Sequence, residues 1–150
     1  NFNLDYYHLA PKISFTGPLE GTLAAWIGYE ALEGDGTSVF QTVIATQHAF
    51  QGWVDKFLTT PPTGIEDTYG GTSYKIPNVL GLDFIRFVAV YNEFDAETGG
   101  ADLGDELDLL AAAKFMKNYT MTLKFADYHA DTFATDTEKI WMYFDATFKF

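Results

Sequence analysis

The stretch IWMYFDATFKF (140–150) alternates apolar and polar side chains along its length. Ile140, Met142 and Phe144 share one parity with the apolar residues that follow, whereas Asp145 lies on the other parity. Successive side chains of a β-strand point to opposite faces. The stretch therefore predicts a strand with one wholly apolar face and one mixed face. Its length is about the 9–11 residues that a tilted strand needs to cross a bilayer.

The same two-residue period recurs upstream in the segments 19–29, 85–92, 106–115 and 119–126. It is weaker in the segments 69–76 and 2–15. Pro11 interrupts the opening segment. The region 105–117 is also rich in helix formers, so a helix there stays open. We favour a strand because Glu106, Asp108 and Lys114 share one parity, which a helix would scatter around its circumference. The pattern predicts an all-β protein of about seven antiparallel strands.

Composition excludes several classes of protein. The chain has 150 residues, 47% hydrophobic and 20% charged, and its longest apolar runs fall far short of a transmembrane helix. The formal charge is -12, and Arg86 is the only arginine, so there is no basic face for nucleic acid. With no cysteine, disulfides, thiol catalysis and cysteine-bound zinc are excluded.

The expected connections alternate in length. Short ones fall at Gly17-Pro18, Pro77-Asn78 and Lys117-Asn118, and longer ones at 34–67, 97–102 and 130–136. Short turns at one end and long loops at the other are typical of an outer-membrane barrel.

A strand count extends this prediction. Single-chain bacterial barrels have an even number of strands, and an open sheet would leave backbone groups unpaired in lipid. We therefore expect residues 1–150 to be the C-terminal portion of a single, larger transmembrane β-barrel domain, with a long loop at about 34–67.

Four stretches carry a resemblance to a known family: GYEALEGDG (28–36), FQTVIATQHAFQGWVDKFLTTPPTGIEDTY (40–69), GGADLGDELDLLAAAKF (99–115) and LKFADYHADTFATDTEKIWMYF (123–144). In them the chain resembles the C-terminal part of outer-membrane porin-like proteins of the alginate-export family. The resemblance implies a larger antiparallel barrel in the outer membrane of a Gram-negative bacterium. It also implies that Phe150 is the terminal aromatic residue recognised by the barrel-assembly machinery. Alginate exporters line their pore with many arginines, whereas Arg86 stands alone here, which argues against alginate as the solute.

Charged side chains on the polar face of the strands are the pore-lining candidates. Opposite charges across a water-filled pore select solutes by charge, although the same residues also serve as ordinary cross-strand pairs. The candidates are Arg86, Glu106, Asp108, Lys114, Lys124, Lys139, Asp145 and Lys149. These candidates give the lumen only a weak net positive charge, and the loops at its mouth are acidic. The pore is therefore predicted to prefer cations weakly or to show little charge preference.

The long loop contains an apolar helical period. Phe50, Trp53, Val54, Phe57 and Leu58 follow an i, i+3, i+4, i+7, i+8 spacing, which predicts a short helix with one apolar face. That face must be buried, either inside the mouth of the barrel as a constriction or on the rim against a neighbouring loop.

Metal and catalytic signals are weak. The carboxylates of the expected loops could bind calcium or the divalent ions that bridge lipopolysaccharide. No stretch of the loops has the ligand spacing of an EF-hand, and the other interpretation is an acidic rim exposed to solvent. No other cofactor is expected. His8, His48 and His129 lack zinc-type spacing, and no serine lies in a nucleophile-elbow context. The sequence predicts that the protein is not an enzyme.

These patterns together predict a porin-type channel in the bacterial outer membrane for passive diffusion of small hydrophilic solutes. Its partners would be the lipid bilayer, lipopolysaccharide, the barrel-assembly machinery and the solutes, with no nucleic acid and with homo-oligomerisation left open. The alternative is a soluble or surface-exposed β-barrel with a ligand-binding or structural role. The alternation of apolar and polar residues cannot distinguish the two kinds of barrel. A membrane barrel turns its apolar face outward and a soluble barrel turns it inward, but the sequence pattern is the same.

Overall fold

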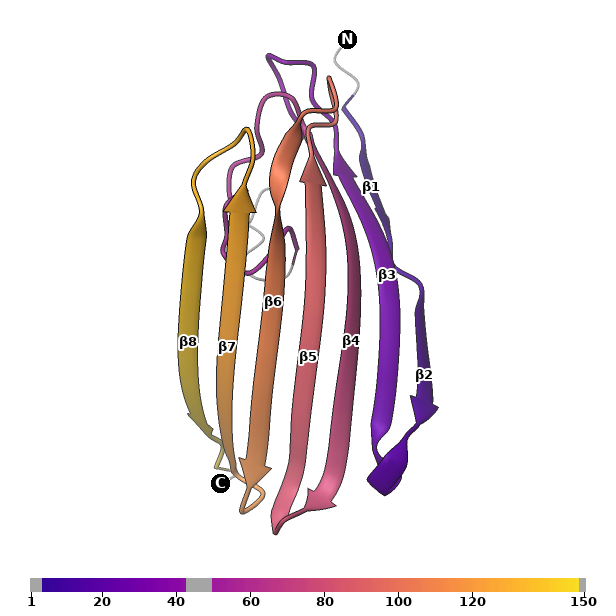
Figure 1. The fold of residues 1–150 in the computed structure, drawn as a ribbon, viewed down its shortest axis with the longest axis vertical. Coiled ribbons are helices and arrows are strands. Elements are labelled where there is room, and N and C mark those ends of the chain that lie inside the picture. Colours follow the sequence, from indigo (N-terminus) through magenta and orange to yellow (C-terminus); the bar gives the residue numbers. More distant parts are fainter. Residues whose placement is uncertain (1–3, 43–49, 149–150) are drawn as a thin grey trace.

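The structure, a computed structural model, describes residues 4–42 and 50–148. In this part of the chain, eight β-strands form one antiparallel sheet, and the helical content is a single 3-10 turn, η1 (Pro18–Glu20). Figure 1 shows the sheet as one layer of long strands. The strands are β1 (Tyr6–Leu9), β2 (Lys12–Thr16), β3 (Thr22–Leu32), β4 (Ile65–Val79), β5 (Leu82–Asp95), β6 (Asp102–Phe115), β7 (Tyr119–Ala130) and β8 (Thr137–Ala146).

The first strand of the sequence prediction is divided in two. β1 and β2 both pair with β3, β1 through Tyr6 opposite Leu32 and β2 through Lys12 opposite Trp26. The break between them contains Pro11, which has no N–H to donate to a ladder. The all-β prediction is confirmed, and the eighth strand arises from this break.

The helix alternative for 105–117 is wrong, because β6 pairs along its length with β5 and with β7. The short connection expected at Pro77-Asn78 is displaced. Both residues belong to β4, and the chain turns at Leu80 and Gly81, where φ is 52° and 78°. Positive φ at both central residues is the geometry of a two-residue hairpin turn whose twist matches its strands.

Short and long connections lie at opposite ends of the sheet. The three long ones, 33–64, 96–101 and 131–136, join strand ends at the upper end of the sheet in Figure 1, which we call the loop end, and the short ones join strand ends at the lower, turn end. The expected alternation of connection lengths is therefore confirmed. The longest loop ends before Ile65 rather than at 67, so Glu66 and Asp67 belong to β4.

The sheet is open among the described residues. Its neighbours run β1-β3-β4-β5-β6-β7-β8, with β2 beside β3, and no pairing joins β8 to the first strands. The two margins lie at opposite sides of Figure 1.

The register gives the sheet two different faces. The outer face carries an uncharged belt that includes Ile27, Phe87, Leu109, Leu123 and Met142, all exposed. On β6 the belt runs from Leu107 to Phe115, eight steps of about 3.4 Å, or about 27 Å along the strand.

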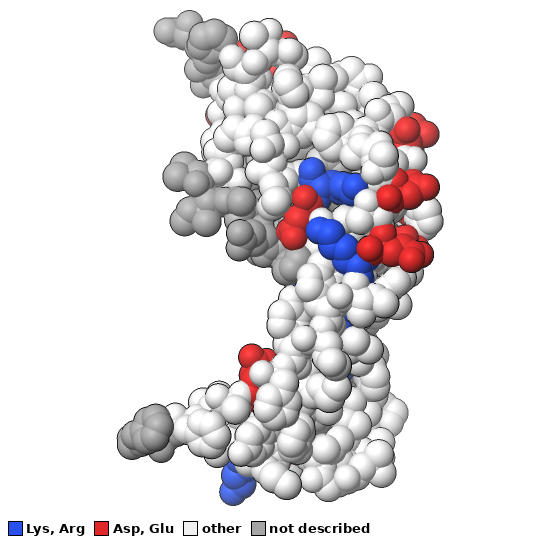
Figure 2. Space-filling view, turned by 90° about the vertical axis from the view of Figure 1, so that its left-hand side faces the viewer, with Lys and Arg blue, Asp and Glu red and all other residues white. Residues whose placement is uncertain are grey.

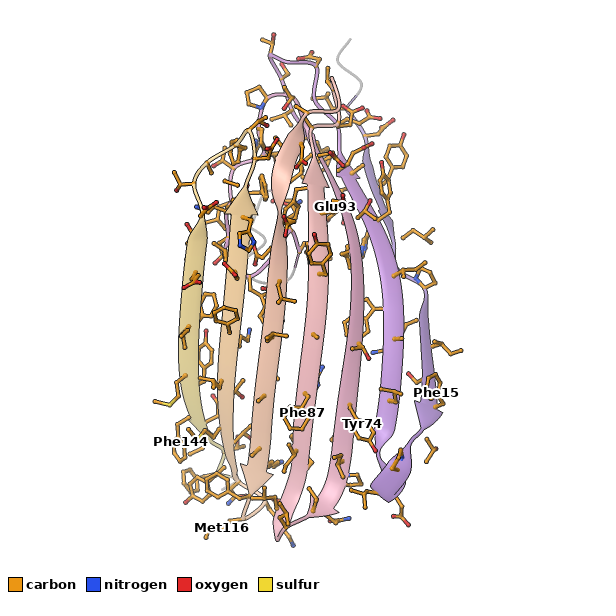
Figure 3. The ribbon with its side chains drawn as sticks, viewed as in Figure 1. Phe15, Tyr74, Phe87, Glu93, Met116 and Phe144 are labelled. Carbon is orange, nitrogen blue, oxygen red and sulfur yellow. The ribbon has the colours of Figure 1, made fainter. Side chains whose placement is uncertain are left out.

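Figure 3 shows Phe15, Phe87 and Phe144 within this belt and Glu93 toward the loop end. Figure 2 shows acidic side chains gathered at the loop end of the outer face above an uncharged surface, and a hollow on the opposite side.

The buried apolar cluster lies at the loop end, between the inner face and the long loop. Its members come from five strands, from the long loop and from the connection after β5: Leu32, Val54, Phe57, Ile65, Phe94, Ala96, Leu103, Ala126 and Tyr128. The packing between the sheet and the rest of the chain is therefore concentrated where the loop returns onto the sheet.

Candidate functional site: the inner face and the loop that covers it

Strand pairing brings the sequence-predicted charges onto one face, the inner face. Cross-strand partners connect Arg86 to Ala112, Asp108 to Ala126 and Ala126 to Lys139, so their side chains share a side. The same pairing places Glu106, Lys114, Lys124 and Asp145 on this face. Lys149 and Phe150 lie outside the described residues.

Every lysine and arginine of the eight strands lies on the inner face. Besides the predicted bases these are Lys12 and Lys75, the latter directly opposite Arg86 on β5. Lys12, Lys75 and Arg86 are exposed. The sequence interpretation omitted Lys12 and Lys75 because their segments show only weak alternation, yet both have the parity of the polar face.

The two acids of β6 are covered, unlike these bases. Glu106 is 0% exposed and Asp108 is 1% exposed. Two further inner-face acids that the sequence interpretation omitted, Glu30 and Asp67, are each 1% exposed. The sequence prediction places Asp67 in the long loop, and it does not include Glu30 among the charges of the polar face, although the parity of Glu30 places it there. The accessible charge of the inner face is therefore mainly basic, because four of its acids are buried at the loop end and only Asp145, near the turn end, is exposed.

The loop is attached to the sheet through the carboxylate of Glu106. Its Oε1 accepts hydrogen bonds from the backbone N–H groups of Trp53, at 2.5 Å, and Val54, at 2.7 Å. Gly52 allows this approach: its φ is +79°, and a Cβ there would lie 2.4 Å from Oε2 of Glu106. Since hydrogen bonds to a charged group are stronger than neutral ones, this contact anchors the loop.

Two lysines extend the attachment toward β8. Nζ of Lys139 donates to the carbonyl oxygen of Val54 at 2.5 Å, and Nζ of Lys56 donates to Oγ1 of Thr137 at 2.7 Å. Nζ of Lys124 lies 4.7 Å above the ring of Trp53, in cation–π range. The loop is thus bound to three adjacent strands, β6, β7 and β8.

The predicted loop helix is wrong: residues 50–58 contain turns and bends and no helix. Phe57 is buried among aromatic rings, with centroids 4.7 Å from Phe94 and 5.3 Å from Phe133. Val54 is 1% exposed, but Phe50 and Leu58 remain 40% and 44% exposed. This irregular segment buries Val54 and Phe57 against the sheet and leaves Phe50 and Leu58 exposed, so the helical spacing did not identify the buried set.

A cavity of about 260 Å³ lies between the loop and the inner face. Gln51, Asp67, Asn92 and Asp108 line its polar side, with Trp26, Trp53 and Tyr69 among its aromatic residues, and Arg86 is also in its wall. Asn92 Nδ2 donates to Asp67 at 3.3 Å, and Gln51 Nε2 donates to Glu30 at 3.4 Å.

The divalent site weighed for the loop acids against a solvated acidic rim has no ligand set in the described residues, where no three His, Cys, Asp or Glu side chains could hold a metal ion. Several loop acids instead cap turns. Oδ1 of Asp35 accepts the N–H groups of Ser38, at 2.6 Å, and Thr37, at 2.8 Å, and these hydrogen bonds lower the pKa of Asp35. His8 contacts Tyr69, and His129 lies 3.8 Å from Asp105 and from Asp127.

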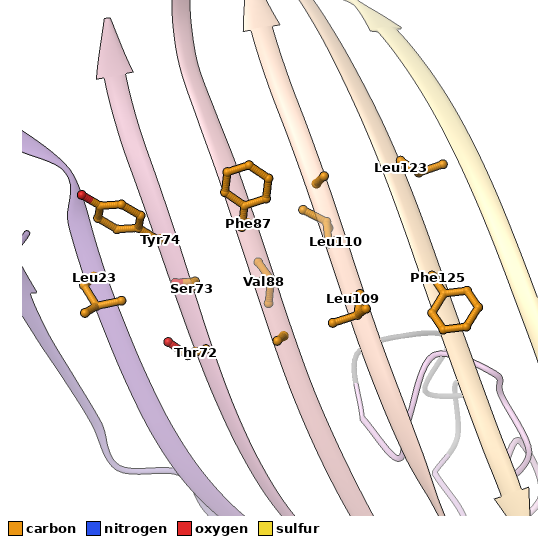
Figure 4. Close-up of a pocket in the computed structure, with 12 residues that line it drawn as sticks. Leu23, Thr72, Ser73, Tyr74, Phe87, Val88, Leu109, Leu110, Leu123 and Phe125 are labelled. Carbon is orange, nitrogen blue, oxygen red and sulfur yellow. The ribbon is translucent and has the colours of Figure 1, made fainter. Parts of the chain in front are cut away.

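The outer face carries a separate apolar groove of about 530 Å³. Figure 4 shows that Tyr74, Phe87, Leu109, Leu123 and Phe125 surround it, and Thr72, Ala89 and Ala111 also line it. Hardly any polar atoms face the groove. Its chemistry suits contact with hydrocarbon rather than with a polar solute.

Comparison of the chain with known protein families, curated proteins and solved structures finds no match. In the described residues, no helix has the length and apolar character required to cross a membrane.

Proposed function

We propose that the chain forms part of the wall of an outer-membrane pore for passive diffusion of small hydrophilic solutes. The observation that carries the proposal is the division of charge between the faces. All strand lysines and arginines point inward, whereas the outer face has an uncharged belt that runs about 27 Å along β6. At the ~35–45° tilt of barrel strands this length covers about 20 Å of height, most of the ~25 Å apolar band of outer-membrane barrels.

The curvature of the sheet supports this orientation. The hollow side in Figure 2 is the side of the loop and of the inner face, and the apolar belt lies on the other side. A soluble ligand-binding barrel would enclose its apolar face. Exposed apolar side chains over several adjacent strands instead suit a lipid-facing wall.

In this proposal the loop narrows the pore from inside. Residues 50–64 would reduce the lumen at the loop end, and the accessible bases Lys75 and Arg86 would line the wall beyond it. Solutes would be selected by size and charge without a covalent step. The remaining barrel strands, the membrane lipids and the assembly machinery would be the partners of the chain.

The test uses the natural full-length protein in planar bilayers, together with spin labels along β7. We expect discrete conductance steps, lipid exposure at Met121, Leu123 and Phe125, and water exposure at Thr122 and Lys124. A monodisperse protein that needs no detergent, or the opposite labelling pattern, would contradict the proposal.

A further inference from the structure

The cavity beneath the loop contains buried oxygen atoms without hydrogen-bond partners. They are Oε1 of Gln51, Oδ1 of Asp67, Oδ1 of Asn92 and Oδ1 of Asp108, and Oε2 of Glu106 lies buried beside Gly52 in the same state. The side chains of Asp108 and Glu106 lie within hydrogen-bonding reach of each other, but two ionised carboxylates offer no donor between them. All five residues are at most 4% exposed. Every one of these atoms is an acceptor, and buried acceptors are costly to leave unpaired. The missing group is therefore a hydrogen-bond donor.

The missing donor should also carry positive charge. Asp67, Glu106 and Asp108 form no ion pair with a lysine or arginine of the described residues. Lys139 donates to the carbonyl of Val54. Lys124 lies over the ring of Trp53 and attracts Asp108 without forming an ion pair with it. Arg86 is in the cavity wall but is exposed and forms no ion pair with these acids. A buried carboxylate without a compensating charge is strongly unfavourable.

The chemistry of the wall favours an organic cation over a metal ion. No three carboxylate or histidine side chains of the described chain converge as metal ligands. Trp26, Trp53 and Tyr69 add aromatic rings, which attract cations and pack against a hydrocarbon chain. The cavity volume of about 260 Å³ is several times the ~30 Å³ that one water molecule occupies in the liquid, so the cavity has room for a small organic group.

We propose that this cavity binds the primary ammonium group of a small solute. An alkylammonium supplies three N–H donors and no acceptor, which matches the orphaned oxygens of Asp67, Asn92 and Asp108. The inference rests on the proposed pore function, since it names the class of solute that the loop-covered site retains. Arg86, in the wall of the cavity, opposes the bound charge, so its removal strengthens binding.

The test titrates the natural full-length protein in detergent with n-butylammonium chloride at neutral pH. Binding is followed by tryptophan fluorescence, because Trp26 and Trp53 line the cavity. 1-Butanol and butyrate, with the same chain length, are the neutral and anionic controls. We expect a saturable change with butylammonium alone. Asp108→Asn should raise the apparent Kd at least ~10-fold, the loss that corresponds to about 1.4 kcal/mol.

Asp145→Asn is the matched control, since Asp145 lies on the same face but is exposed and far along the strand toward the turn end. It should bind butylammonium as the natural protein does, and Arg86→Gln should bind it more tightly. Asp67→Asn replaces Asp108→Asn if the latter does not fold. An equal response to 1-butanol, no saturable response to butylammonium, or full binding by both Asp variants overturns the proposal.

Conductance of the same preparation separates this inference from the pore itself. Channels that conduct but show no amine binding refute the ammonium site and leave the pore function intact. Amine binding by a protein that does not conduct refutes the pore function and leaves the site.

Discussion

Oε1 of Glu106 accepts a hydrogen bond of 2.7 Å from the backbone N–H of Val54, which lies 52 residues earlier in the chain. This contact joins the longest loop to β6 near the loop end of the sheet. Because Val54 also offers its carbonyl oxygen to Lys139, one peptide segment links β6 and β8. The position of the loop therefore depends on a few charged contacts and on the aromatic anchor beside them.

Gly52→Ala should release the loop. Its φ of +79° is strained for alanine, and the new Cβ would displace the Glu106 carboxylate. We expect a loss of unfolding free energy above the ~1 kcal/mol of backbone strain alone, together with faster proteolysis of the loop. Gly100→Ala is the control, because Gly100 has φ of +59° and nothing within 4 Å of its Cβ position. Equal effects of the two variants would remove the argument for close approach at Gly52.

Phe57→Ala should lower the unfolding free energy by about 3–5 kcal/mol, as expected for a buried aromatic side chain. Phe57 is 2% exposed and contacts Phe94 and Phe133. Leu58→Ala, at a neighbouring position that is 44% exposed, should change it by less than ~0.5 kcal/mol. Chemical denaturation of both variants in the same detergent measures the difference. A larger effect at Leu58 would mean that the other side of the loop is buried.

Lys139→Met and Glu106→Ala should be energetically coupled. Both side chains hold the same peptide segment, Lys139 through the Val54 carbonyl and Glu106 through the Val54 N–H. We expect each single variant to speed hydrogen exchange of the loop amides, and a double-mutant cycle to show coupling above ~0.5 kcal/mol. Strictly additive effects would show that the two contacts act independently.

Leu123→Arg should disrupt membrane assembly, and Thr122→Arg should not. Leu123 lies in the uncharged belt of β7, and its neighbour Thr122 lies on the inner face. An arginine near the bilayer midplane costs about 2–4 kcal/mol on the lipid side of a barrel, whereas lumen positions tolerate it. Yield of heat-resistant protein in the outer membrane measures the effect. Comparable yields from both variants would contradict the assigned orientation.

Arg86→Gln should shift the reversal potential of the pore toward cations in a salt gradient. Arg86 is exposed on the inner face and faces Lys75 across the β4–β5 pair, so its charge contributes to the field in the lumen. Glu93→Gln, on the outer face, should leave the reversal potential unchanged. An unchanged potential in the Arg86 variant would place this side chain outside the conducting path.

The strand pattern was predictable because it depends on local alternation. Ile140, Met142 and Phe144 share a face whatever their neighbours are, since strand geometry alone fixes that. The same parity assigned Arg86 and Lys124 correctly to one side of the sheet. The long loop was not predictable in this way: the spacing of Phe50 to Leu58 fits a helix, yet docking onto the sheet favours an irregular path with Phe57 inward.

The sequence by itself determined the class of fold, the two faces of each strand and the alternation of short and long connections, because each follows from side-chain period and turn residues within a few positions. Tertiary structure decided which charges are accessible. Glu106 and Lys114 have the same parity, but Glu106 is covered by residues more than fifty positions away, whereas Lys114 is only partly buried. Burial of a charge depends on such long-range contacts, and strand period contains no information about them.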